Sequence, residues 1–162
     1  RRNEAFQIKK EGLVDGNKTN IVTGKRGKKF PLVYLDDTKE LIRQWLNFRG
    51  EDNIESIWCR INKNGNKHEI TYDTIYDWVL KISEILSEIE GKEIHIFAHS
   101  YRHSRIESLL QGSDTRLLDK DGKPKKFTLE QVQKFAHHES SDTTLSYAKD
   151  HSEDVIDDMF GF

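Results

Sequence analysis

Apolar positions repeat at helical spacing along several segments of the chain. The longest repeat starts near Asp73 and ends at Gly91, a residue type that commonly terminates helices. Its apolar residues, three or four positions apart, are Ile75, Trp78, Val79, Ile82, Ile85, Leu86 and Ile89. We predict that this segment is a helix of the core.

Further helices are predicted by their first and last residues. The stretch HSYRHSRIESLLQG is amphipathic, so a helix is expected over residues 99–111 with Gly112 as its stop. A short helix is expected from about Asp142, and it would carry Tyr147. Two other helices follow a capping-box pattern: Asp37 with Glu40 before residues 38–49, and Thr128 with Gln131 before residues 129–136.

Strand-like patterns occupy the first half of the chain. Residues 19–35 read as two short strands around a basic turn that contains Gly24 and Gly27, and residues 56–72 read as another strand and turn. Residues 113–127 read as a loop with a turn at Asp121–Gly122. We therefore predict an α+β fold that is mainly α-helical, with a small antiparallel β-sheet near the N-terminus, in a single domain over residues 1–162.

Composition and charge limit the function classes. Hydrophobic residues make up 35% of the 162 positions, but no apolar run approaches the roughly 20 residues that span a bilayer, so a membrane partner is not expected. Cys59 is the only cysteine, which excludes an internal disulfide and favours a reducing, cytoplasmic location. The net charge of −2 is unevenly distributed, with nine Lys/Arg against three acids in residues 1–29 and five acids without Lys or Arg in residues 150–162.

The clustered histidines and arginines fit two kinds of chemistry. The regular spacing of His95, His99 and His103 would suit a metal, but no carboxylate stands at ligand spacing beside them, so neither a metal nor a cofactor is expected. The other chemistry is phosphate binding, because guanidinium groups donate paired, charge-assisted hydrogen bonds to phosphate oxygens. Such a site requires arginines, imidazoles for proton transfer, a lysine and a nucleophile.

Four motifs, which follow one another along the chain in the family's own order, resemble the catalytic domain of the tyrosine recombinases, the phage-integrase family. HSYRHS has that family's histidine, two residues, arginine and second histidine, and HESSDTTLSY has a histidine nine residues before a tyrosine with a Thr-Thr pair between them. GKRGKKFPL resembles the family's lysine turn before a Pro-Leu strand, and RRNE resembles the start of the helix that carries its first arginine. The matched positions are Arg1, Lys25, His99, Arg102, His138 and Tyr147.

The resemblance implies that three of these residues, Tyr147, His99 and Lys25, form the new bond or transfer protons. Tyr147 would attack the scissile phosphate of double-stranded DNA and form a 3′-phosphotyrosyl link. His99 would take the tyrosine proton, because a phenol with a pKa near 10 is a weak nucleophile at neutral pH. Lys25 would protonate the leaving 5′-oxygen.

The other three residues would hold the phosphate. Arg1 and Arg102 would bind the non-bridging oxygens, and His138 would donate a further hydrogen bond. The choice of His138 over His137 rests on its spacing to Tyr147. Either of the other turn lysines, Lys28 or Lys29, could replace Lys25, whereas Arg105 and Arg116 are expected on the surface.

The resemblance also leaves differences and alternatives. The sequence starts at Arg1, so an N-terminally truncated domain is expected. The stretch from Arg102 to His138 is about a dozen residues longer than in compact members of the family, so residues 113–127 are expected to be an inserted loop. A DNA-binding fragment without catalysis and a type IB topoisomerase, which shares this chemistry, remain alternatives to a bacterial or phage recombinase acting on the nucleoid. The apolar stripe of the acidic tail, residues 150–162, would either pack on its own domain or couple protomers in a homo-oligomer, expected to be a tetrameric synapse on DNA.

Overall fold

The computed structural model describes residues 1–11, 13, 17–138 and 144, and it divides the chain into two compact units, Arg1–Ala98 and His99–Phe162. The predicted short helix around Tyr147 and the tail over residues 150–162 lie outside the described residues. No helix in the described part of the chain is long and apolar enough to cross a membrane. The division into one domain, an inserted loop and a tail stays a prediction.

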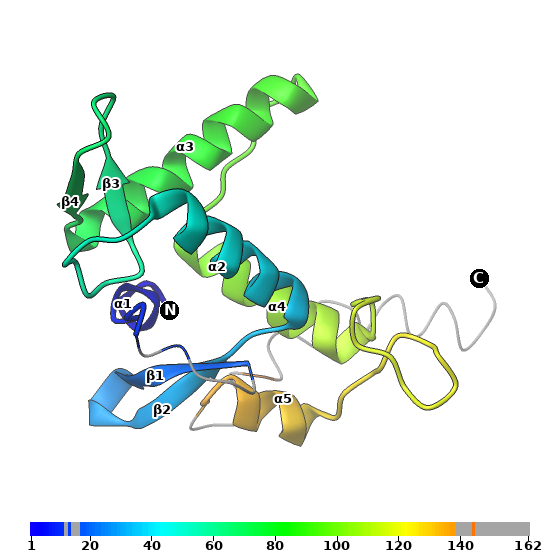
Figure 1. The fold of residues 1–162 in the computed structure, drawn as a ribbon. Helices are drawn as coiled ribbons and strands as arrows, with labels where there is room; N and C mark the ends of the chain where they lie inside the picture. The colour runs from blue at the N-terminus through cyan, green and yellow to red at the C-terminus, as the bar shows by residue number, and fades with distance from the viewer. Residues whose placement is uncertain (12, 14–16, 139–143, 145–162) are drawn as a thin grey trace. The chain divides into compact units, whose positions relative to one another are not determined.

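The first unit mixes helices with two small sheets (Figure 1). In chain order its elements are α1 (Arg2–Phe6), β1 (Lys18–Thr23), the 3-10 turn η1 (Lys25–Gly27), β2 (Lys29–Val33), α2 (Asp36–Arg49), β3 (Cys59–Ile61), β4 (Lys67–Glu69) and α3 (Tyr72–Glu90). The predicted basic turn is thus η1, between β1 and β2. The sheet prediction needs one correction, because β1 with β2 and β3 with β4 form two separate antiparallel pairs.

The backbone before β3 pairs with the N-terminal segment. Lys9 pairs with Ser56, and the amide of Ile57 donates to the carbonyl of Ile8 at 3.0 Å. The β1–β2 hairpin places Val22 opposite Phe30, and both side chains are buried. The N-terminal segment therefore joins the hairpin of β1 and β2 to the segment that leads into β3.

Helix α2 starts earlier than its capping-box pattern predicted. Leu35 is its N-cap, without a side-chain cap, and the Asp37 carboxylate accepts instead from the amide of Thr38 at 2.6 Å. The capping prediction for Asp37 and Glu40 was therefore wrong. At the other end, Arg49 is buried to 2% exposure, because its guanidinium donates to Asp52 and to three backbone carbonyls.

Helix α3 confirms the predicted helix but not its full burial. Gly91 ends it in the left-handed conformation, as expected. Its N-terminal half packs against α1 and Trp58, and Val79 is buried. By contrast, Ile85 is 44% exposed and Ile89 is 72% exposed. The prediction that the whole helix belongs to the core was therefore wrong for its C-terminal half. The helical repeat shows which residues share one face, but it does not show whether another element covers that face.

Two serines of α3 bind the segment that leads to the next helix. The Ser83 hydroxyl donates to the carbonyl of Ile94 and accepts from the amide of Ile96 at 2.9 Å. Ser87 accepts from the amide of Ile94 at 2.8 Å. The serine hydroxyls therefore satisfy backbone groups of Ile94 and Ile96, and residues 94–96 belong to no strand.

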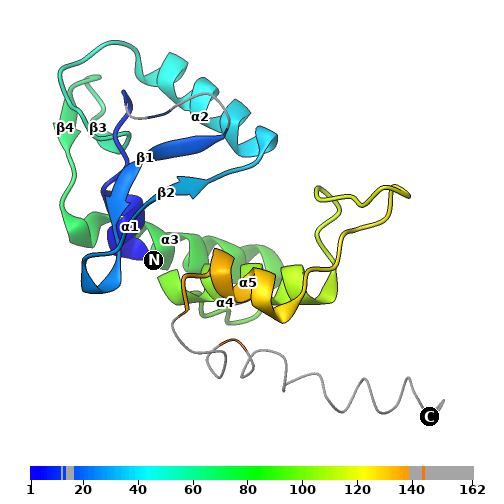
Figure 2. The ribbon, with the colours of Figure 1, turned by 90° about the horizontal axis from the view of Figure 1, so that it is seen from below.

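The second unit is built on α4 (Ala98–Gln111) and α5 (Leu129–Phe135), which share a core. Both helices were predicted, as were Gly112 at the end of α4 and the capping box of Thr128 with Gln131. The two helices lie side by side in both views (Figures 1 and 2). The buried residues of this core are Ile106, Leu109, Val132 and Ala136, with Leu110, Leu117 and Phe127 packed against them.

Candidate functional site

The first turns of α4 carry the central motif. Arg102 is partly buried, and its Nη2 donates a hydrogen bond to the backbone carbonyl of Ala136 at the end of α5. His99 lies at an exposed position, with its ring edge-on to the ring of His103 at 4.5 Å between centroids. The Arg102 contact ties the arginine of the motif to the chain two residues before His138.

His138 is held on two sides. Its amide donates to the carbonyl of Gln133 at 3.1 Å, and its Nδ1 lies 2.8 Å from the hydroxyl oxygen of Thr144, which is fully buried. If the Thr144 hydroxyl donates to Nδ1, the ring carries its proton on Nε2 and can donate from that atom. His137, the rival candidate, is exposed and has a positive φ of 51°.

The first unit holds Arg1 through a buried carboxylate. Arg1 Nη1 donates to Glu4 Oε1 at 2.8 Å, and Glu4 is only 3% exposed. Burial by itself raises the pKa of Glu4, but the hydrogen bond from the Arg1 side chain, the adjacent terminal amino group and the Arg1 charge oppose it, and the pKa is lowered overall. Glu4 is thus a charged group that orients the Arg1 guanidinium.

The same carboxylate lies beside the turn that carries Lys25. A Cβ atom placed on Gly24 would lie 3.2 Å from Glu4 Oε1 and 2.7 Å from the Phe30 ring, so a larger residue does not fit there. Gln7 also exchanges hydrogen bonds with both backbone groups of Thr23, at 2.8 and 3.0 Å. The start of α1 and the basic turn are therefore adjacent, with Lys25 exposed on the turn.

The predicted site residues thus form two groups. Arg1 and the Lys25 turn meet at Glu4 in the first unit, and Arg102 meets the His138 segment at Ala136 in the second. Tyr147 lies outside the described residues. Convergence of all six residues on one surface stays a prediction.

Sequence reasoning missed a second polar cluster at the far end of α4. Asp114 is 8% exposed and accepts from Arg116 Nε at 2.8 Å and from Arg105 Nη1. Hydrogen bonds from Arg116 and Arg105 hold its pKa well below the usual range. Arg105, which was expected on the surface, is partly exposed, with 27% of its side chain accessible, and it fastens the start of the 113–127 loop to α4.

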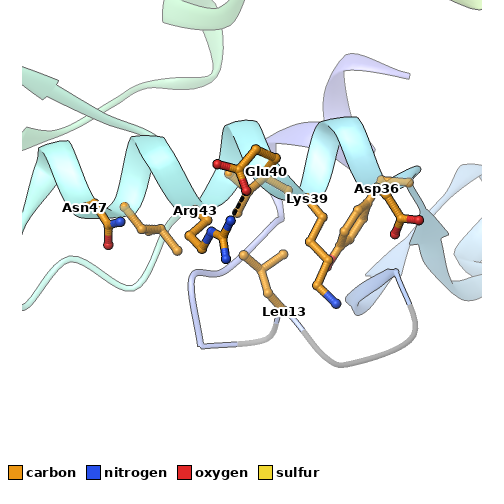
Figure 3. Close-up of a pocket in the computed structure, with 9 residues that line it drawn as sticks. Leu13, Asp36, Lys39, Glu40, Arg43 and Asn47 are labelled. Carbon is orange, nitrogen blue, oxygen red and sulfur yellow. Dashed lines mark hydrogen bonds and ion pairs between the residues drawn. The ribbon is translucent and has the colours of Figure 1, made fainter.

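A metal site and a surface cavity are two other kinds of site that the described residues could form. Among the described residues, no three His, Cys, Asp or Glu side chains gather closely enough to hold a metal ion. A cavity of about 420 Å³ lies along α2, with Leu13 opposite the helix and a Glu40–Arg43 ion pair at its edge (Figure 3). Its lining contains none of the motif residues; it consists of Leu13, Tyr34, Asp36, Lys39, Glu40, Ile42, Arg43, Leu46 and Asn47.

Comparison with solved structures identifies the fold. The crystal structure of XerA recombinase matches over 91% of this chain with a TM-score of 0.62 and 15% sequence identity. The fold is that of a tyrosine-recombinase catalytic domain. XerH site-specific recombinase matches over 96% of the chain, with a TM-score of 0.60 and 20% identity in its post-cleavage complex with a palindromic difH substrate. Its pre-cleavage complex with difH gives 0.59 and 21%.

The structural match covers only part of each of those recombinases. This chain spans 47% of XerA and 40% of XerH. No protein-family model matches the sequence, and no curated protein does. The predicted fold class is therefore confirmed, and the resemblance to the tyrosine recombinases is confirmed at the level of the fold.

Proposed function

We propose that this chain is the catalytic region of a site-specific DNA recombinase that cleaves and rejoins strands through a 3′-phosphotyrosyl intermediate at Tyr147. One observation carries the proposal: in a tyrosine-recombinase fold, the arginine of the HSYRH motif is fastened to the segment that bears His138. The motif residues of α4 and the histidine that precedes Tyr147 are thus parts of one assembly, within the second unit.

In the proposed reaction, each bond change at phosphorus is accompanied by one proton transfer. The Tyr147 oxygen attacks phosphorus while His99 takes its proton, and the bond from phosphorus to the 5′-oxygen breaks as Lys25 supplies that oxygen with a proton. Arg1 and Arg102 bind the non-bridging oxygens as negative charge develops on them. The phosphotyrosyl link keeps the energy of the broken ester bond, so the 5′-hydroxyl of a second DNA end can displace the tyrosine without an external energy source.

In this proposal His138 is neutral and accepts the Thr144 hydrogen bond at Nδ1. With Thr144 donating to Nδ1, the Nε2–H group points its proton at the phosphate. Glu4 plays the equivalent part for Arg1, because a charged, buried carboxylate fixes the guanidinium before DNA arrives. Preorganisation of this kind lets donors stabilise the transition state without rearranging.

Double-stranded DNA and further copies of the chain are the proposed partners. The XerH structures contain a difH substrate, in line with a DNA substrate here. A tetrameric synapse, coupled through the tail over residues 150–162, would bring two sites together for strand exchange. A cytoplasmic location in a bacterial or phage-infected cell, on the nucleoid, fits this substrate.

The test is covalent trapping on a duplex with a nick near the cleavage point, which releases a short fragment and prevents religation. Wild-type protein should form a detergent-resistant DNA adduct, and Tyr147→Phe should form none while it binds DNA as before. Tyr101→Phe, at an exposed position of α4, is the matched control and should still form the adduct. An adduct with Tyr147→Phe, or none with wild-type protein, contradicts the proposal.

A second measurement separates recombination from related activities. Wild-type protein that traps DNA and joins two target sites is a recombinase. Trapping with relaxation of supercoiled DNA but without joining would indicate a type IB topoisomerase, and binding without trapping would indicate a DNA-binding fragment.

A further inference from the structure

The 113–127 loop is an ordered, basic hairpin. Leu118 pairs with Pro124, the amide of Asp119 donates to the carbonyl of Lys123 at 2.8 Å, and Gly122 turns the chain with a φ of 75°. The Asp119 carboxylate accepts from two further amides of the turn, those of Asp121 and Lys123, at 2.9 and 3.0 Å. The backbone of the tip is therefore fixed by its own hydrogen bonds.

The base of this hairpin is attached to α4. Asp114 joins it to Arg105, and the amide of Phe127 donates to the carbonyl of Leu109 at 3.0 Å. Gly112 approaches the Lys126 backbone so closely that an added Cβ would lie 3.1 Å from its Cα. The hairpin extends beyond the C-terminal end of α4 in both views (Figures 1 and 2).

Four exposed lysines lie along this hairpin: Lys120, Lys123, Lys125 and Lys126. None of them forms an ion pair with a described residue, and the Asp119 carboxylate is engaged by backbone amides. Lys125 lies over the Phe127 ring at 5.0 Å, which directs its stem along the base of the hairpin. Against Asp119 and Asp121, these lysines give residues 119–126 a balance of +2, in a chain whose net charge is −2.

We propose that this hairpin is a second DNA-backbone contact, separate from the phosphate at the Tyr147 site; the inference rests on the proposed function. Lysine is a compact, mobile charge that binds phosphates without demanding a fixed geometry, as a sequence-independent contact requires. Lysine is depleted at protein–protein interfaces, whose centres are aromatic or apolar, and the tip over residues 119–126 contains no large apolar side chain. Nucleic acid is therefore a better partner than a protein surface.

The hairpin acts on affinity and not on the chemical step. Along α4, Gln111 lies twelve positions after His99, which corresponds to a rise of about 18 Å at 1.5 Å per residue, or about five base pairs of B-DNA. The lysines therefore contact phosphates several base pairs from the scissile one, and they hold the duplex without touching the reacting atoms.

The experiment compares two quadruple variants that change the net charge equally. The hairpin variant carries K120Q, K123Q, K125Q and K126Q, and the control carries K39Q, K63Q, K81Q and K92Q at exposed positions of the first unit. Fluorescence anisotropy with a duplex of about 40 base pairs, over about 50–200 mM salt, gives Kd and its salt dependence. All eight side chains are on the surface, so both variants should fold.

We expect the hairpin variant to bind about tenfold more weakly near 0.1 M salt, with the slope of log Kd against log salt reduced by about 2 to 3. The control should change the slope by less than about 1. At saturating protein, the rate of adduct formation on the nicked duplex should be unchanged in the hairpin variant.

Four results would overturn the inference. An equal loss of affinity in both variants would show a general effect of charge. A hairpin variant that binds as tightly as wild-type protein, with the same steep salt dependence, would reject the hairpin contact and leave the proposed function intact. Loss of self-association in sedimentation, with normal DNA binding, would assign the hairpin to the acidic segment over residues 150–162 of a second copy. Failure of wild-type protein to bind the duplex at all would reject the proposed function as well.

Discussion

The Nδ1 atom of His138 lies 2.8 Å from the hydroxyl oxygen of Thr144, a side chain with no solvent exposure. Thr144→Val keeps the shape of the side chain but leaves Nδ1 without its partner. A lost hydrogen bond to a buried group is worth about 1–3 kcal/mol, so we expect adduct formation to slow by about tenfold or more with DNA binding retained. Single-turnover trapping measures this, and Thr144→Ser, which restores the hydroxyl, should recover most of the rate.

Replacing Arg102 with lysine should be more severe than its charge suggests. An ammonium cannot reproduce the paired contact to phosphate or, at the same time, the bond to the Ala136 carbonyl. We expect Arg102→Lys to reduce adduct formation by about a hundred- to a thousandfold. The same substitution at Arg43, an exposed arginine of α2, should leave trapping near the wild-type rate. Near-normal cleavage by Arg102→Lys would mean that this arginine only supports the structure.

Arg49 is predicted to be the most sensitive charged residue for stability. Its side chain is fully buried and joins Asp52 to the carbonyls of Ile54, Ser56 and Ile57. Arg49→Met leaves those acceptors unsatisfied, and we expect a loss of about 3–5 kcal/mol in the free energy of unfolding. Arg43→Met on the same helix removes only an exposed ion pair and should change it by less than about 1 kcal/mol. Denaturant melts of the two variants decide the matter.

The Asp52 carboxylate gives this cluster a pH dependence. The Arg49 hydrogen bonds hold the pKa of Asp52 well below the ordinary value near 4. Its contribution to stability is therefore complete above about pH 4 and is lost as the pH falls toward the lowered pKa of the folded protein. Melts at descending pH should show a steeper loss for wild-type protein than for Asp52→Asn, which has no carboxyl to protonate. Parallel curves would show that protonation of Asp52 does not contribute to the pH dependence of stability.

Two glycines of the second unit separate backbone strain from crowding. Gly112 and Gly122 have similar positive φ values, 71° and 75°, but only Gly112 has backbone atoms where a Cβ would lie. Gly122→Ala should cost about 1–2 kcal/mol through strain in the left-handed region. Gly112→Ala should cost more, because the Lys126 backbone must also move. Thermal melts compare the two, and an equal loss would mean that the base of the hairpin yields easily.

Local signals in the sequence predicted most elements of the fold but not their burial. Gly91, Gly112 and the Thr128 capping box marked real helix ends, since these are contacts within a few residues. The capping pattern at Asp37 failed because the helix already begins at Asp36, with Leu35 as its N-cap. Ile89 shows the other limit, because helical spacing predicts a face and the packing partner is set by the tertiary fold.

The candidate site was predictable as a set of positions and not as an assembly. Motif spacing selected Arg102 and His138, but their link runs through a backbone carbonyl, that of Ala136, which has no signature in sequence. Glu4 was noticed only as part of a motif, whereas the structure shows it buried between Arg1 and Gly24. Such supporting contacts depend on which segments meet, so they require the structure.

The anchoring of the 113–127 segment has a consequence for how such proteins can diversify. Asp114 fixes one end of the segment to α4, and the amide of Phe127 fixes the other. These two attachments do not depend on the length or sequence of the chain between them. Additions or deletions in that interval leave Arg102 and Ala136 where they are. The interval is therefore a natural place for lineages to exchange segments of different length, and a site where an engineer can graft a foreign peptide without disturbing the helices.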